Sequence, residues 1–362
     1  MDRRKLHAGD DPGWCGYRTL MVVTVFVMVL PAWARLIPGD VLHMDIVNLM
    51  VLSGIYACVV IGLNLLFGYA GQISLGHAAF FGIGAYTTAI LCTKVHGFPT
   101  PLGVLAGALL AAAVGWLVGK PVLRLKGNYL AMATLGLGEI AFILFQQVKG
   151  LTGGTVGILD IPPLSVFGLK FDTDLKYYFV VWAIVMLLML LSINLIRSRV
   201  GRALRALHSS EVAADAMGVN TGRYKTNVFI LSAGFAGLGG ALFALFQKYI
   251  NPESFVLSVS ILFVTMVVVG GMGDIWGGLI GVVLLTFLPS VIQALPQWIP
   301  GMPPGLTNFS NYQLVLYGLL LILFMMFLPK GVAFGLSRAG AGLRLRARHL
   351  VERYRARKVE GS

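Results

Sequence analysis

Residues 45–86 read DIVNLMVLSGIYACVVIGLNLLFGYAGQISLGHAAFFGIGAY. The stretch holds one apolar run over 45–67, a short turn from Gly68 to Gly71, and the start of a second apolar run over 73–93. A helix that crosses a bilayer needs about 20 predominantly apolar residues. In lipid such a run must be helical, because every backbone N–H and C=O needs an internal partner. The stretch therefore predicts two consecutive membrane helices.

The same pattern recurs along the whole chain of 362 residues. Its composition is 57% apolar and 12% charged, whereas soluble domains average about 45–50% and 25%. This composition excludes an ordinary soluble protein and a disordered chain. We expect an all-α polytopic membrane protein with about ten transmembrane helices, at 19–34, 45–67, 73–93, 101–119, 128–147, 177–196, 226–247, 256–272, 275–293 and 312–328.

The basic residues predict the orientation, because short cytoplasmic loops carry an excess of Lys and Arg. With ten spans and both termini in the cytoplasm, 22 of the 28 Lys and Arg residues fall inside and six outside. The chain then divides into a cytoplasmic N-terminal segment (1–18), a transmembrane domain (19–328) with a cytoplasmic loop (197–225), and a basic cytoplasmic tail (329–362). Ala32-Trp33-Ala34 resembles a signal-peptide cleavage site. However, the 18-residue segment before that span, with Asp10 and Asp11, is unusual for a signal peptide.

Motifs for enzyme chemistry are absent from the sequence. There is no phosphate-binding Gly-x-x-x-x-Gly-Lys-Ser/Thr, no His-Glu-x-x-His and no Gly-x-Ser-x-Gly. Cys15, Cys58 and Cys92 follow no metal or redox spacing. We therefore expect no catalytic residue, metal or cofactor. Glu139 is the one carboxylate well within a predicted span, which weakens a proton-relay mechanism; energy for transport would have to come from a partner.

Several polar residues lie within or beside the predicted spans. Such groups can line a path for a solute, or they can hydrogen-bond neighbouring helices, and spacing alone favours the second interpretation. The candidates for a path are Asn64, Gln72, Ser74, His77 and Glu139.

Two spans carry small residues at four-residue spacing. In lipid, such ladders let helix backbones approach closely. We expect these residues to pack against other helices, although a ladder facing lipid has the same spacing. The ladder residues are Gly103, Gly107 and Gly115 in one span and Gly273, Gly277 and Gly281 in the other.

The loop over 197–225 predicts a short helix. Ser209 or Ser210 can cap its N-terminus, and Glu211 in the first turn suits the helix dipole. Gly218 suits its C-terminal stop. Its small residues would let another protein approach closely. From the residues alone, this docking interpretation and a solvated basic loop that only sets topology are equally favoured. The residues at issue are Ser210, Glu211, Ala213, Ala214, Asp215 and Gly218.

Five stretches, taken in order, resemble the LivM-like permease subunits of branched-chain amino-acid ABC importers. Thr155-Val156 departs from the Pro-Asn that is common there. The resemblance covers about residues 45–335 and rests on GYAGQISLGHAAFFGIGAY (68–86), KPVLRLKGNYLA (120–131), TGGTVGI (152–158), NPESF (251–255) and GGMG (270–273).

The resemblance implies the fold of a type II ABC importer permease in the bacterial cytoplasmic (inner) membrane. It implies a second, LivH-like permease subunit, two cytoplasmic ATP-binding subunits and an extracytoplasmic substrate-binding protein as partners. The segment from Ser210 to Gly218 would be the coupling segment that docks on the ATPase. The Arg-rich tail would contact membrane lipid, and no nucleic acid is expected. A urea or short-amide permease of the same family, and an ion-coupled secondary transporter, are the alternatives.

Overall fold

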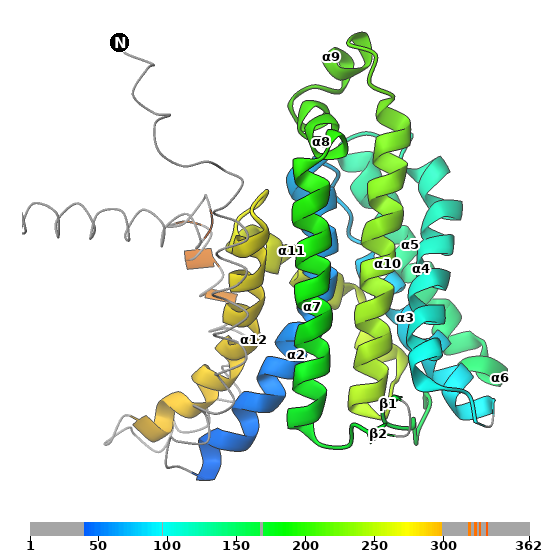
Figure 1. Cartoon of the computed structure of the whole chain (residues 1–362), viewed down its shortest axis with the longest axis vertical. Coiled ribbons are helices and arrows are strands. Elements are labelled where there is room, and N and C mark those ends of the chain that lie inside the picture. The colour runs from blue at the N-terminus through cyan, green and yellow to red at the C-terminus, as the bar shows by residue number, and fades with distance from the viewer. Residues whose placement is uncertain are drawn as a thin grey trace, which may run out of the picture. The chain divides into compact units, whose positions relative to one another are not determined.

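The structure is a computed structural model (Figure 1) and describes residues 40–95, 97–166 and 169–298, with the single positions 318, 319, 322, 323, 326 and 331. The N-terminal segment (1–18), the expected span at 19–34, and nearly all of the span at 312–328 and of the basic tail lie outside the described residues. The chain forms two compact units, residues 1–264 and 265–362, which are considered separately.

The described part of the first unit is almost entirely helical, with one antiparallel hairpin of two-residue strands. The elements are α2 (Asp40–Asn64), η1 (Leu65–Tyr69), α3 (His77–Lys94), α4 (Thr100–Val122), α5 (Asn128–Gln147), α6 (Lys149–Thr152), β1 (Ser165–Val166), β2 (Leu169–Lys170), α7 (Asp174–Arg197), α8 (Arg199–Ser209), α9 (Glu211–Ala216), α10 (Thr221–Gln247), η2 (Pro252–Phe255) and the start of α11 (Leu257–Gly270).

Seven segments in the described residues are long and apolar enough to cross a membrane. This agrees with the expected all-α membrane class. Helix α3 is not among the seven, and it is shorter than the apolar run at 73–93. The backbone leaves the helical conformation at Gly71, which takes a left-handed φ of 67°. Residues 71–76 are not helical, and α3 begins at His77.

Helix α10 forms the centre of the first unit, with α2, α3 and α4 packed along it. Small residues allow the helices to approach closely. A Cβ on Gly84 of α3 would overlap the backbone of Gly237 on α10, and one on Gly107 of α4 would lie 2.7 Å from the Gly84 oxygen. Any larger side chain at these crossings would push two helices apart.

The expected ladder on α4 lies on its protein-facing side. A Cβ on Gly103 would lie 2.8 Å from Cys92 Sγ of α3, and one on Gly115 would lie 2.7 Å from Ala233 Cβ of α10. In contrast, Leu109 and Leu117 on the opposite side of α4 are largely exposed.

The two ends of the first unit differ. At one end, α8 and α9 lie beyond α7 and α10; at the other are the hairpin β1–β2 and a glycine-rich connection (Figure 1). There Ile158 and Ile250 exchange two backbone hydrogen bonds of 2.9 and 3.1 Å, which join the segment after α6 to the segment after α10.

The second unit contains the end of α11 and helix α12 (Ile275–Trp298). A Cβ on Gly270 would overlap the Gly277 carbonyl, and one on Gly281 would lie 2.8 Å from Gly270 Cα, so these residues lie at the crossing of the two helices. The expectation that Gly273 belongs to the same helical ladder is wrong. Gly273 lies in the turn between α11 and α12 with a left-handed φ of 77°, outside either helix.

Candidate functional site

Helix α9 has defined signals at both ends. The Ser210 hydroxyl accepts a hydrogen bond from the Ala213 N–H at 3.3 Å. At the other end Gly218 adopts φ of 81°, and the Val219 N–H donates to the Ala214 carbonyl at 3.0 Å. The Gly218 N–H also donates to the Asp215 carbonyl at 2.9 Å. Two such hydrogen bonds around a left-handed glycine form the Schellman motif, which commonly ends helices. The predicted short helix is confirmed, with Ser210 rather than Ser209 as its cap.

The outward surface of α9 is partly apolar. The side chains of Val212 and Met217 are 75% and 85% exposed, and Ala213 is exposed beside them. Ala214 does not belong to this surface. It is only 4% exposed, so the expectation that it forms part of a small-residue docking face is wrong for this residue. Ala214 faces the rest of the first unit, and its small side chain lets the short helix α9 pack closely against it.

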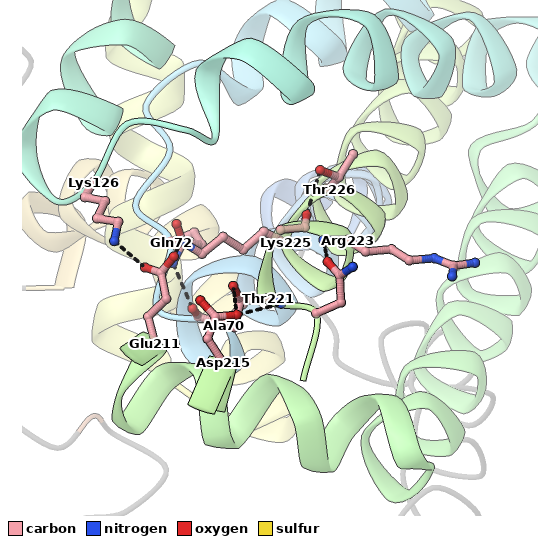
Figure 2. Close-up of polar contacts among 11 residues, drawn as sticks. Ala70, Gln72, Lys126, Glu211, Asp215, Thr221, Arg223, Lys225 and Thr226 are labelled. Atoms are coloured by element: carbon pink, nitrogen blue, oxygen red, sulfur yellow. Dashed lines mark hydrogen bonds and ion pairs between the residues drawn. The ribbon is translucent and has the colours of Figure 1, made fainter. Parts of the chain in front are cut away.

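Glu211 joins α9 to two other segments. Its Oε1 lies 2.7 Å from the Lys225 ammonium on α10, and its Oε2 lies 3.8 Å from the Lys126 ammonium in the turn between α4 and α5 (Figure 2). The Lys225 side chain is 4% exposed, whereas that of Lys126 is 69% exposed. The first contact therefore joins a buried ammonium to a carboxylate whose side chain is 27% exposed. The second contact is largely exposed to solvent, where ion pairs contribute little.

Asp215 makes a second connection between α9 and α10. Its Oδ1 accepts from the Thr221 hydroxyl at 2.7 Å and from the Thr221 N–H at 3.4 Å (Figure 2). Thr221 begins α10, so this carboxylate stabilises the N-terminus of that helix. Ser210, Glu211 and Asp215 thus all position α9, while Val212 and Met217 are free to meet another protein.

A buried polar chain lies deeper in the first unit. The Ser74 hydroxyl and His77 Nδ1 are 3.0 Å apart, and His77 Nε2 and the Ser232 hydroxyl are 2.7 Å apart. All three side chains are buried. The chain ties α3 and the segment before it to α10, so Ser74 and His77 here hydrogen-bond neighbouring elements, as the spacing favoured.

Two other path candidates lie in the connection between α2 and α3. Asn64 is fully buried at the end of α2. Gln72 is half-buried, and its Nε2 donates to the Ala70 carbonyl at 3.1 Å. The structure thus brings Ser74 and His77 together and places Gln72 in a local turn.

Glu139 has a different environment from the other candidates. It lies midway along α5 and is exposed, as are Met132 and Ile140 on the same helix. A Cβ on Gly136 would meet nothing within 4 Å. A carboxylate that faces hydrocarbon is costly. If α5 spans the membrane, we therefore expect water or another protein to cover its outer face at Glu139. No cluster of metal-ligating side chains occurs among the described residues.

Comparison with known proteins identifies this architecture. The profile of the protein family described as "Branched-chain amino acid transport system / permease component" matches residues 45–325. The chain belongs to this permease family. The matched region includes α9, the buried polar chain and α5.

Individual relatives agree with the family assignment. The permease is 34% identical to the high-affinity branched-chain amino acid transport system permease protein LivM of Escherichia coli K12, over 86% of this chain and 74% of the relative. It is 36% identical to LivM of Salmonella typhimurium LT2, over 79% and 69%, and 27% identical to LivH of that organism, over 79% and 93%. No solved structure matched the chain. The permease is thus LivM-like, a multi-pass membrane transport protein and not an enzyme.

Sequence reasoning missed three residues of the site. In the sequence, Lys126 and Lys225 stand out only as cytoplasmic charges, and Ser232 is an isolated polar residue within an apolar run. Ser232 lies 155 positions from His77, and no periodicity connects residues that far apart. No sequence signal singles out Lys225, because α10 begins with the polar segment TGRYKTN (221–227), in which the neighbouring Arg223 is exposed.

Proposed function

We propose that this permease is one of two membrane subunits of an ATP-driven importer for branched-chain and other apolar amino acids. Its partners would be a LivH-like permease, two cytoplasmic ATP-binding subunits and an extracytoplasmic binding protein. The family match over residues 45–325 carries the proposal. The sequence has no nucleotide-binding motif of its own, so the energy must enter through a contact with another subunit.

The proposed orientation has ten spans in a type II importer fold, with both termini and α9 in the bacterial cytoplasm. Support comes from the distribution of Lys and Arg. The N-terminal segment (1–18), the transmembrane domain (19–328) and the basic tail (329–362) follow from the same assignment.

Cysteine labelling tests this orientation. Cys15, Cys58 and Cys92 are first replaced by serine, and single cysteines are placed at Met217 or Gly150, exposed positions at opposite ends of the first unit. A membrane-impermeant thiol reagent applied to intact cells should label only Gly150→Cys. Labelling of Met217→Cys from outside would reverse the proposed orientation.

Docking of the ATPase is assigned to the exposed side of α9. Val212 and Met217 give it an apolar contact at the end of the unit that carries the basic residues. Val212→Asp and Met217→Asp should each reduce co-purification of the ATPase subunits, because a buried unpaired carboxylate weakens an interface. Val156→Asp, an exposed valine at the opposite end, is the matched control. Normal co-purification of both α9 variants would reject the assignment.

The substrate path is assigned to the outer face of α5, at the contact with the second permease. Glu139 on this face would attract the ammonium group of an amino acid. Ser74 and His77 would shape the wall of the path by holding α3 to α10, and Asn64 and Gln72 would lie beside them.

Uptake by the reconstituted complex distinguishes the candidate functions. Proteoliposomes that contain both permeases and the ATPase subunits, supplied with binding protein and ATP, should accumulate leucine. Accumulation of urea without leucine would favour an amide permease of the same family. Transport by the purified single subunit under an ion gradient would favour a secondary transporter.

A further inference from the structure

We propose that the Glu211–Lys225 ion pair is a positioning contact which, beside the Asp215–Thr221 hydrogen bonds at the start of α10, couples a movement of α9 to α10 and to the buried Ser74–His77–Ser232 chain. The inference rests on the proposed docking of the ATPase on α9. It assigns Glu211 an inward role, distinct from contact with the ATPase.

Because the Lys225 side chain is buried, its ammonium depends on Glu211 as its partner. Its side chain is 4% exposed, and its ammonium lies 2.7 Å from Glu211 Oε1. A buried charge without a partner is strongly unfavourable. A displacement of α9 that carried Glu211 away would separate this ammonium from its carboxylate, which favours a movement of Lys225 together with Glu211. Lys126 is a weaker tether, because it is 3.8 Å from Glu211 and largely exposed.

The next step runs along one face of α10. Lys225, Phe229 and Ser232 are spaced by four and three positions, so they lie on the same side of the helix. Phe229 is 1% exposed and meets the His77 ring edge-on, with 6.3 Å between ring centroids. Ser232 hydrogen-bonds His77 Nε2. This face of α10 therefore connects the partly buried ion pair to the polar chain two turns away.

Helix α10 is packed too closely against its neighbours for a small local rearrangement to accommodate such a movement. Glycines at its crossings with α3 and α4 bring backbone against backbone, with no flexible side chains in between. Interiors packed this tightly transmit displacement instead of deforming. A shift at Lys225 is thus passed to His77 and to the start of α3.

The test measures leucine uptake and ATP hydrolysis together in proteoliposomes of the complete complex. Glu211→Gln should leave the ATPase subunits bound, because Val212 and Met217 are unchanged. Leucine transported per ATP hydrolysed should fall by about tenfold, a size typical of coupling between sites. Arg223→Gln is the matched control: it removes a positive charge from the same part of α10, and its side chain points away from Glu211 (Figure 2). The Arg223→Gln complex should transport as much leucine per ATP hydrolysed as the wild-type complex.

Two further variants separate transmission from stability. Glu211→Gln with Lys225→Met removes both charges, so no ammonium is left unpaired; the subunit should fold normally while uptake per ATP stays low. Glu211→Lys with Lys225→Glu reverses the pair and should restore uptake per ATP.

Wild-type uptake per ATP in the neutral double variant would overturn the proposal, as would failure of the reversed pair to restore it. Loss of ATPase co-purification in Glu211→Gln would also overturn it, because the pair would then support docking itself. Failure of the docking assignment is recognised separately, by normal co-purification of Val212→Asp and Met217→Asp.

Discussion

Helices α10 and α5 are both apolar enough to cross the membrane, yet their surroundings are opposite. In the most apolar window of α10, 78% of the residues are buried within the chain, whereas in that of α5 the share is 22%. Helix α10 meets its neighbours through glycine and alanine. Helix α5 presents Met132, Ile140 and Glu139 outward.

The difference separates two kinds of constraint on a membrane helix. Substitutions on α10 act on the folding of the subunit, because its contacts are made within the chain. Substitutions on the outer face of α5 act on what the subunit meets, because nothing in the described part of the first unit covers that face. Each of the following measurements tests one side of this contrast.

The largest effect is expected at Gly237. A Cβ there would overlap Ala111 Cβ and lie 3.0 Å from the Gly107 oxygen. Gly237→Leu should destabilise the subunit by about 3 kcal/mol, the upper part of the range for overpacked cores, and reduce its level in membranes. Thermal unfolding of the detergent-purified subunit measures this. Gly136→Leu, on the open face of α5, is the matched control and should unfold like the wild type. If both variants unfolded at the same temperature, the proposed difference between the buried helix α10 and the exposed face of α5 would be wrong.

An intermediate effect is expected at Ser232. Ser232→Ala leaves His77 Nε2 without its partner in a buried site, which costs about 1–3 kcal/mol. The same unfolding assay applies. Thr226→Ala is the control on the same helix, because the Thr226 hydroxyl donates to the Gly222 carbonyl one turn back within α10. If the two alanine variants unfolded at the same temperature, the polar chain would not stabilise α10.

The smallest effect on folding is expected at Glu139. Glu139→Gln should change the stability of the isolated subunit by less than about 0.5 kcal/mol, as at other exposed positions. Uptake by the complete complex should fall by about tenfold, equivalent to about 1.4 kcal/mol. Ile140→Leu, the exposed neighbour, should affect neither measurement. Unchanged uptake in Glu139→Gln would show that this face of α5 does not serve transport.

Much of the helical architecture follows from the sequence. The apolar runs predict the spans from 45 to 293 to within a few residues, apart from α3, which begins at His77. The helix α9 follows from Ser210 and Gly218, because capping and a left-handed stop are local properties.

The orientation of side chains around each helix could not be predicted in the same way. Lipid and protein interior are both apolar, so periodicity does not distinguish the buried side of α10 from the outer side of α5. Glycine spacing does carry this information for α4. It fails for Gly273, because the same residue type also serves turns. The inward position of Ala214 and the pairing of Glu211 with Lys225 depend on how α9 folds back on α10, which no local signal specifies.

The central place of α10 also has a consequence for biogenesis. The helices that surround it, α2, α3 and α4, are made first, and Gln247 at the end of α10 follows Val122 at the end of α4 by 125 residues. At about 5–20 residues per second, the ribosome needs roughly 6–25 s to supply α10 after α4 has emerged. During that interval the glycine-bearing sides of α3 and α4 are not yet covered by α10. The backbone crossings of α10 with α3 and α4 can therefore form only after α10 has been made.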